Sequence, residues 1–505
     1  MRSKKAIINT IVAILQEAVG VVCGLILPRL ILSAFGSSYN GITSSITQFL
    51  ACVVLLRGGV GAVTRAALFK PLAENDTENV SAIMNATQQF MRKVALIFAG
   101  ALVIFACLYP LLVSYEFDWL FSFTLVMILG ISTFMEYYFG ITNLFLLQAD
   151  QKQYIVSIVQ MISTVLNTLF AFLLIKLGCG IHLVKLGSAL AFSINPILRY
   201  LYVRKRYKVD KTVAPNFDKI KQRWDAFWQT FAFFVNSNCP IMILTFFADI
   251  KEVSVYTVYN YVIANIRNIV NTFITGFGAA FGNMLAKGEH DLAKKNLRVF
   301  ELVIFNLVSI VYTTAGVMVL PFVSVYTNGI TDVEYYRPIY AVVATVAGAF
   351  SCFRIPYQSI VEAAGHFKQT KIGAFVEAVL NIVISVICVI KFGLIGVAIG
   401  TLVATVIRSV EYAIYVSKHI IKRSQFIFFV HILVTSGIAV LTAVISDAFF
   451  TFATPNYLYW AAKSILVVLI STALTAITDL AFFKNETFYM IKKVKGIITG
   501  RTKKK

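Results

Sequence analysis

The chain has 505 residues, of which 58% are apolar by type, 14% are aromatic and only 14% are charged. Its mean hydropathy is +0.79, and soluble proteins carry nearer a quarter of charged residues. This composition excludes a soluble enzyme, a secreted module or a disordered chain as a description of the whole. We therefore expect a protein whose main solvent is lipid.

The charge balance is strongly basic, with 45 Lys and Arg against 24 Asp and Glu, which gives a formal net charge of +21. In a soluble protein this excess would indicate nucleic acid as a partner. In membrane proteins, however, Lys and Arg concentrate in the cytoplasmic loops. The distribution of these residues along the chain separates the two interpretations.

Long apolar runs predict the membrane-spanning helices. A hydrocarbon core of roughly 30 Å requires about 20 apolar residues per helix, and polar interruptions divide the chain into fourteen such runs. We therefore predict an all-α polytopic membrane protein with fourteen transmembrane helices. Their predicted ranges are 6–34, 41–68, 94–114, 117–147, 154–176, 180–203, 226–248, 254–285, 298–325, 338–363, 371–391, 393–417, 427–450 and 457–483.

Loop charge predicts the orientation. If the N-terminus is cytoplasmic, the inside loops hold about 32 Lys and Arg and the outside loops about 4, as the positive-inside rule requires. Both termini are therefore expected in the cytoplasm, and no nucleic-acid partner is needed. The basic stretches 204–223 and 484–505 can bind anionic lipid head groups or serve simply as topology signals in solvated linkers.

An internal repeat predicts two similar halves. Gly59-Val60-Gly61-Ala62 is echoed by Gly276-Phe277-Gly278-Ala279, and Leu166-Asn167 by Leu380-Asn381, at offsets of about 214–217 residues. We predict two pseudo-symmetric six-helix lobes followed by a C-terminal helix pair. The expected domains are an N-lobe at 1–203, a basic cytoplasmic linker at 204–225, a C-lobe at 226–417, and the last two helices with a basic tail at 418–505.

Patterns for catalysis or for metal binding are absent from the sequence. The chain contains no P-loop, HExxH or GxSxG motif, and its five histidines are dispersed. The seven cysteines form no CxxC pair or metal-ligand spacing, so we interpret them as small apolar residues. We expect neither an enzyme nor a metal or other cofactor.

Arginines within the predicted helices are the main candidates for function. An ionisable side chain costs roughly 2.5–3.5 kcal/mol at the centre of a membrane helix, so it normally faces water or a partner. Guanidinium groups also bind phosphate through two parallel hydrogen bonds. The candidates for a cationic, substrate-binding cavity are Arg29, Arg57, Arg65, Arg267 and Arg354.

Polar residues share helix faces with two of these arginines. Asn260 and Asn271 lie within about 40° of Arg267 at 100° per residue, and Gln358 lies near Arg354. Interhelical ion pairing is the alternative for each arginine. It is favoured for Arg408 with Glu411, whereas the cavity is favoured for Arg57 and Arg267. Both interpretations stay open for Arg29, Arg65 and Arg354, with Glu362 as a possible partner of Arg354.

Two acidic residues in predicted helices are candidates for coupling transport to protons or sodium ions. They are Glu17 in the first predicted helix and Glu136 in the fourth.

Several loop motifs resemble a known family. They are Phe35-Gly36-Ser37-Ser38-Tyr39-Asn40-Gly41, Arg57-Gly58-Gly59-Val60-Gly61 with Arg65 after it, and Leu147-Gln148-Ala149-Asp150. With the 6+6+2 layout, they resemble the bacterial polysaccharide flippases of the multidrug, oligosaccharidyl-lipid and polysaccharide exporter superfamily.

This resemblance implies a flippase of the bacterial cytoplasmic membrane. Two lobes would alternately open a central cavity and carry polyprenyl-pyrophosphate-linked oligosaccharide to the outer leaflet, with glycan polymerase and glycosyltransferases as partners. In the related lipid II flippases, cavity arginines lie on helices equivalent to those that contain Arg29, Arg57 and Arg267. The last two helices, 427–483, would then help to form a groove for the lipid tail.

Three alternatives remain. The chain could be a multidrug cation antiporter of the same superfamily, which should line its cavity with carboxylates, and Glu17 is the best residue for that role. It could carry a peptidoglycan precursor, lipid II, instead of a polysaccharide precursor. It could also be a scramblase-like or scaffolding component that organises glycan assembly, in which case the buried arginines would be dispensable.

Overall fold

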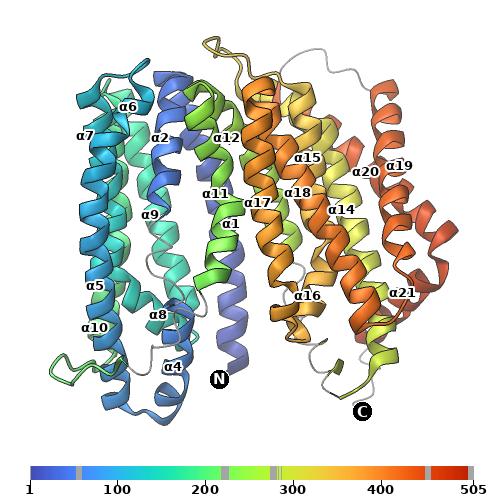
Figure 1. Cartoon of the computed structure of the whole chain (residues 1–505), viewed down its shortest axis with the longest axis horizontal. Helices are drawn as coiled ribbons and strands as arrows, with labels where there is room; N and C mark the ends of the chain where they lie inside the picture. The colour runs from blue at the N-terminus through green and yellow to red at the C-terminus, as the bar shows by residue number, and fades with distance from the viewer. Residues whose placement is uncertain are drawn as a thin grey trace. The chain divides into compact units, whose positions relative to one another are not determined.

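A computed structural model describes residues 2–52, 60–217, 227–272, 281, 284–285, 287–449 and 456–498, and every regular element within them is a helix (Figure 1). The helices of the first half are α1 (Arg2–Phe35), α2 (Ser37–Leu50), α4 (Val60–Glu74), α5 (Thr77–Leu108), α6 (Pro110–Val113), α7 (Trp119–Met135), the π-helix η1 (Glu136–Gly140), α8 (Ile141–Ala149), α9 (Gln153–Lys176), α10 (Ile181–Arg206), α11 (Phe227–Phe247) and α12 (Ile250–Thr272). Those that follow are α14 (His290–Tyr326), α15 (Pro338–Phe353), α16 (Ile355–Ala363), α17 (Phe367–Phe392), α18 (Leu394–Tyr415), the π-helix η3 (Val416–Ile420), α19 (Phe426–Phe449), α20 (Tyr457–Phe482) and α21 (Lys484–Ile498).

Within the described residues, 11 helical segments are long and apolar enough to cross a membrane. Each coincides with one of the predicted segments, which confirms an all-helical, multi-pass membrane protein. The second, seventh and eighth predicted segments are not among the 11. Helices α2, α11 and α12 occupy parts of them, and residues 53–59 and 273–280 lie outside the described part. The predicted total of fourteen is therefore not confirmed.

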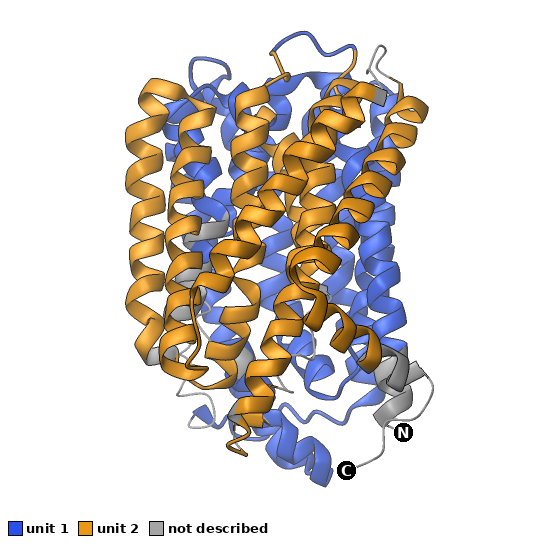
Figure 2. Cartoon of the chain, turned by 90° about the vertical axis from the view of Figure 1, so that its right-hand side faces the viewer, with its two compact units in different colours: residues 1–254, 329–333 blue, residues 255–328, 334–505 orange. Residues whose placement is uncertain are grey.

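The described chain divides into two compact units (Figure 2). Unit 1 comprises residues 1–254 and 329–333, and unit 2 comprises residues 255–328 and 334–505. Packing thus places a boundary within α12. The lobes predicted from the repeat, 1–203 and 226–417, remain a prediction.

Polar contacts hold α2 within unit 1. Ser45 and Thr245 are joined by a buried hydroxyl contact of 2.8 Å, and Asn40 donates to Ser254 over the same distance. Gly41 lies so close to the start of α12 that a β-carbon would collide with the carbonyl of Ile250. The glycine in this loop motif therefore permits two helices to approach closely.

The short segment 329–333 joins unit 1 through a capping interaction. Gly36, with φ of 92°, precedes α2 and has no side chain to cap it. The carboxylate of Asp332 accepts hydrogen bonds from the backbone N–H of Ser37 at 2.6 Å and from its hydroxyl at 2.7 Å. A carboxylate here satisfies a free N–H and complements the positive end of the helix dipole.

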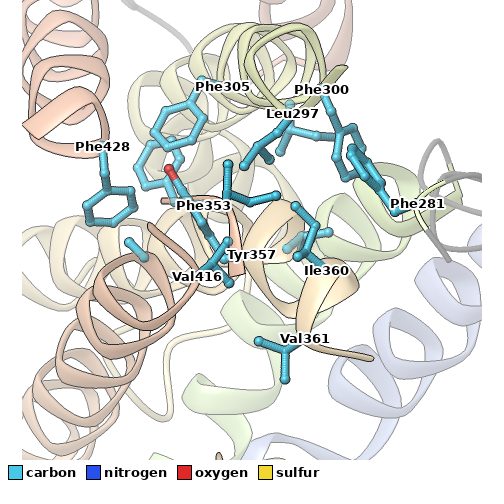
Figure 3. Close-up of a cluster of buried hydrophobic side chains, with 14 of the residues drawn as sticks. Phe281, Leu297, Phe300, Phe305, Phe353, Tyr357, Ile360, Val361, Val416 and Phe428 are labelled. Atoms are coloured by element: carbon cyan, nitrogen blue, oxygen red, sulfur yellow. The ribbon is translucent and has the colours of Figure 1, made fainter. Parts of the chain in front are cut away.

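An aromatic cluster forms a core of unit 2 (Figure 3). The rings of Phe305 and Phe353 stack with centroids 4.6 Å apart, and Phe428 contacts Phe305 edge to face. Beside this cluster, Glu301 on α14 and Arg423 before α19 form an ion pair through both carboxylate oxygens. Their side chains are 0% and 2% exposed, so the pair ties α14 to the loop before α19.

Replacing Glu301 with glutamine should destabilise the protein strongly, because the charge of Arg423 would stay buried without its partner. We expect a loss of about 3–5 kcal/mol in the free energy of unfolding. Denaturation of the detergent-solubilised full chain, with and without the substitution, measures this loss in the free energy of unfolding.

The matched control is Glu486→Gln, which breaks the pair between Arg298 and Glu486, whose side chains are 44% and 24% exposed. Its cost should stay below about 1 kcal/mol. Equal losses in the two variants would contradict the structural role of the buried pair.

Candidate functional site

The described cavity candidates of unit 1 are Arg29 and Arg65. Arg29 follows Pro28 within α1 and is partly buried. Arg65 on α4 donates to the side-chain oxygen of Gln148 at 3.0 Å, and its guanidinium lies 5.9 Å from the centre of the Phe145 ring. The contact between α4 and α8 therefore sets the position of Arg65. Arg57 lies outside the described residues.

Three candidates lie on α12. Arg267 and Asn271 are exposed, and Asn260 is partly buried. Their spacing along one uninterrupted helix, Ile250–Thr272, places them on a common face as expected. Within the described part of the chain no carboxylate forms an ion pair with Arg267. Its charge is therefore available to water or to an anion.

Arg354 occupies a different environment from Arg267. It lies between the end of α15 at Phe353 and the start of α16 at Ile355. Its Nη1 contacts Oε1 of Glu377 on α17 at 2.6 Å. The expected alternative partner, Glu362, instead accepts a hydrogen bond from Gln358 at 2.8 Å. The alternative of a pair with Glu362 was wrong, because positions eight apart on a helix lie about 12 Å apart along its axis.

Glu377 also contacts a second arginine, which gives a four-charge network in unit 2. Arg408 Nε lies 3.6 Å from the second oxygen of Glu377, and Arg408 Nη1 lies 2.7 Å from Glu411. The predicted pairing of Arg408 with Glu411 is thus confirmed. A β-carbon on Gly373 would collide with both side chains of that pair, so this glycine allows α17 to approach α18. The network favours a structural role for Arg354.

The two candidates for ion coupling also differ. Glu136 begins the π-helix η1 and pairs with Arg199 on α10, which is 5% exposed. A β-carbon on Gly140 would collide with Pro196, so the two helices approach closely beside this pair. Glu17 is exposed on α1. No ion pair of Glu17 occurs among the residues that the structure describes.

Sequence reasoning missed the partners of several buried charges. Arg199 and Glu301 lie near the ends of predicted helices, where charges are normally attributed to the interface. On the C-terminal helices, Lys463 pairs with Asp447 at 2.6 Å, and Asp479 accepts from Asn306 at 2.5 Å. Lys463 and Asp479 are buried, so the partners on neighbouring helices hold both side chains inside the protein. Spacing within one helix carries no signal for such contacts.

Comparisons with known proteins identify the fold. No protein-family model matches the chain, and no curated protein matches its sequence. The solved structure of the lipid II flippase MurJ in an inward closed conformation matches with a TM-score of 0.71 at 14% identity, covering 95% of this chain and 99% of that one.

Multidrug transporters of the MATE family have a similar fold. An outward-facing structure matches with a TM-score of 0.57 at 13% identity, covering 81% of this chain and 93% of that one. A transporter of the MOP superfamily from Pyrococcus furiosus, described as having a binding pocket of reverse polarity, matches with a TM-score of 0.55 at 12% identity, covering 83% and 97%. The predicted likeness to the exporter superfamily is confirmed at the level of the fold, and this chain has the fold of the MOP-superfamily flippases and transporters.

Proposed function

We propose that the chain is a flippase that moves polyprenyl-pyrophosphate-linked oligosaccharide from the inner to the outer leaflet of the bacterial cytoplasmic membrane, for export of surface polysaccharide. The match to the lipid II flippase supports this class of function, because it covers 95% of the chain. The match to the outward-facing multidrug transporter covers 81%. Arg267 carries the proposal for an anionic cargo. It is exposed on α12 without an acidic partner among the described residues, and lipid is a costly environment for such a group.

Guanidinium chemistry fits a pyrophosphate. Each arginine can donate two parallel hydrogen bonds to phosphate oxygens and stays charged at every physiological pH. In the proposal, Arg29, Arg57, Arg65 and Arg267 contact the pyrophosphate in a central, water-filled cavity. The amides of Asn260, Asn271 and Gln358 bind sugar hydroxyls, and the prenyl tail stays in lipid. Arg354 acts through Glu377 to hold α17 in place.

Alternating access loads and releases cargo efficiently only if the two states differ in affinity. Cargo binds the inward-open state, and release requires that the outward-open state hold pyrophosphate less tightly, because equal affinity would shift no population. An inside-negative membrane potential favours exit of an anion by about 2.3 kcal/mol per charge per 100 mV. Glu17 is the better candidate for ion coupling, since Glu136 is engaged by Arg199.

The surroundings of the protein complete the proposal. Both termini lie in the cytoplasm, and the basic stretches contact anionic lipid head groups. A glycan polymerase and glycosyltransferases remain predicted partners. The two lobes of the repeat supply the two halves of the alternating cycle.

Translocation of lipid-linked oligosaccharide in liposomes tests the cavity arginines. Arg57→Ala and Arg267→Ala should each slow translocation by about tenfold or more, because each removes a charge-assisted contact to phosphate. The matched control is Arg298→Ala, which removes an arginine that is partly exposed beside Glu486. Wild-type rates in both test variants would contradict the proposal that these arginines bind the cargo in a cavity. Lipid II, supplied as a competing cargo, distinguishes a peptidoglycan precursor from a polysaccharide precursor.

A multidrug cation antiporter is the second candidate, and the exposed carboxylate of Glu17 on α1 favours it. An antiporter would bind organic cations or protons at such a group. Under our proposal, ethidium efflux from cells that express the protein stays at background, and Glu17→Gln does not change it. Efflux that Glu17→Gln abolishes, with normal surface glycan, would support the antiporter instead.

A further inference from the structure

A polar pocket lies within unit 1. It has a volume of about 660 Å³ and is bordered by α5, η1, α8, the end of α10 and the chain that follows α10. Its size falls in the range of small-molecule sites. None of the arginines assigned to the pyrophosphate lines it.

One buried hydroxyl in the lining of this pocket has no hydrogen-bond partner among the described residues. It belongs to Thr142, which is 1% exposed. Beside it, Asn143 is buried and donates its amide N–H to the carbonyl of Phe139 at 3.1 Å. Gln88 donates to the carbonyl of Tyr138 at 2.7 Å. An unpaired buried hydroxyl is costly, so this lining favours a ligand with hydroxyl or phosphate oxygens.

The rim is cationic. Arg92 lies over the ring of Tyr138 at 5.3 Å, and Lys211 lies over the ring of Tyr200 at 5.9 Å. Arg204 also lines the pocket. Across the described residues, none of these three cations forms an ion pair with a carboxylate. Their N–H groups therefore remain available to an anion.

Among the lining residues, Asp210 is the one carboxylate, and local hydrogen bonds occupy it. It accepts from the backbone N–H of Thr212 at 2.8 Å and from the Thr212 hydroxyl at 2.7 Å. These bonds lower the pKa of Asp210 below its ordinary value, so it is ionised at neutral pH. Three cations against one engaged carboxylate leave the pocket positive.

The wall formed by the chain after α10 is fixed in place. The amide of Asn85 donates to the carbonyls of Asp210 at 2.9 Å and Val213 at 2.8 Å. The backbone N–H of Asp210 donates to Ser81, and the Tyr207 hydroxyl donates to Asp150 at 2.5 Å. The pocket is thus preformed, which reduces the entropy lost on binding.

We propose that this pocket binds a phosphate group with a small hydroxylated substituent, such as a phosphoglycerol group. The cations recognise the phosphate, while the Thr142 hydroxyl and the amide oxygens of Asn85 and Gln88 recognise the hydroxyls. A nucleotide fits less well, because a cation already covers one face of the Tyr138 ring and one face of the Tyr200 ring, which leaves less aromatic surface to stack on a base. The group can come from an anionic phospholipid or from a soluble phosphate ester. This inference does not depend on the proposed flippase activity.

Native mass spectrometry of the purified full chain tests the proposal with two probes, phosphatidylglycerol and glycerol 3-phosphate, and phosphatidylcholine as the zwitterionic control. Arg92→Gln and Arg204→Gln should each weaken binding about tenfold, because each removes a charged donor to phosphate. The matched controls are Lys93→Gln and Lys205→Gln. Both lysines are exposed neighbours on the same helices and do not line the pocket.

Thr142→Val supplies a second, nearly isosteric variant. It should weaken binding about threefold and raise the unfolding temperature of the unliganded protein, because it removes a buried hydroxyl that has no partner there. Binding of phosphatidylglycerol alone would assign a lipid source, and binding of glycerol 3-phosphate would assign a soluble one. The proposal is overturned if neither probe binds, or if the control variants lose as much affinity as the test variants.

Discussion

The cost of a charge in hydrocarbon is the constraint on which this structure depends. A charged side chain inside a membrane must be paired or must reach water. The buried charges of the described helices are largely paired, for example Arg199 with Glu136, Glu301 with Arg423, and Lys463 with Asp447. Each pair joins separate segments of the chain, so charge compensation also fixes how the helices pack.

The same constraint separates two classes of arginine. Arg354 and Arg408 share Glu377 and belong to the structural class, which holds α17 against its neighbours. Arg267 belongs to the other class, because it is exposed and has no carboxylate partner within the described chain. Arg92 and Arg204 resemble Arg267 in lacking an acidic partner, but they line a separate pocket. Arginines without a carboxylate partner therefore mark the places where an anionic ligand is proposed.

Sequence patterns predicted what is local and failed where contacts are distant. The length and apolarity of single helices predicted 11 spans correctly, and the i,i+3 spacing predicted the pair of Arg408 with Glu411. The partner of Arg354 could not be predicted, because Glu377 lies on another helix. The anion pocket was missed for the same reason, since hydrogen bonds from α5 fix its outer wall.

Cysteine accessibility tests the central claim that the polar face of α12 meets water. In the full chain with its native cysteines replaced, Asn260, Arg267 and Asn271 are each changed to cysteine and treated in membranes with an impermeant thiol reagent. Leu169 on α9 and Val383 on α17, which are exposed apolar residues, serve as lipid-facing controls. The account predicts labelling at the three α12 positions and none at the controls. Protection of Arg267→Cys to the level of Leu169→Cys would contradict it.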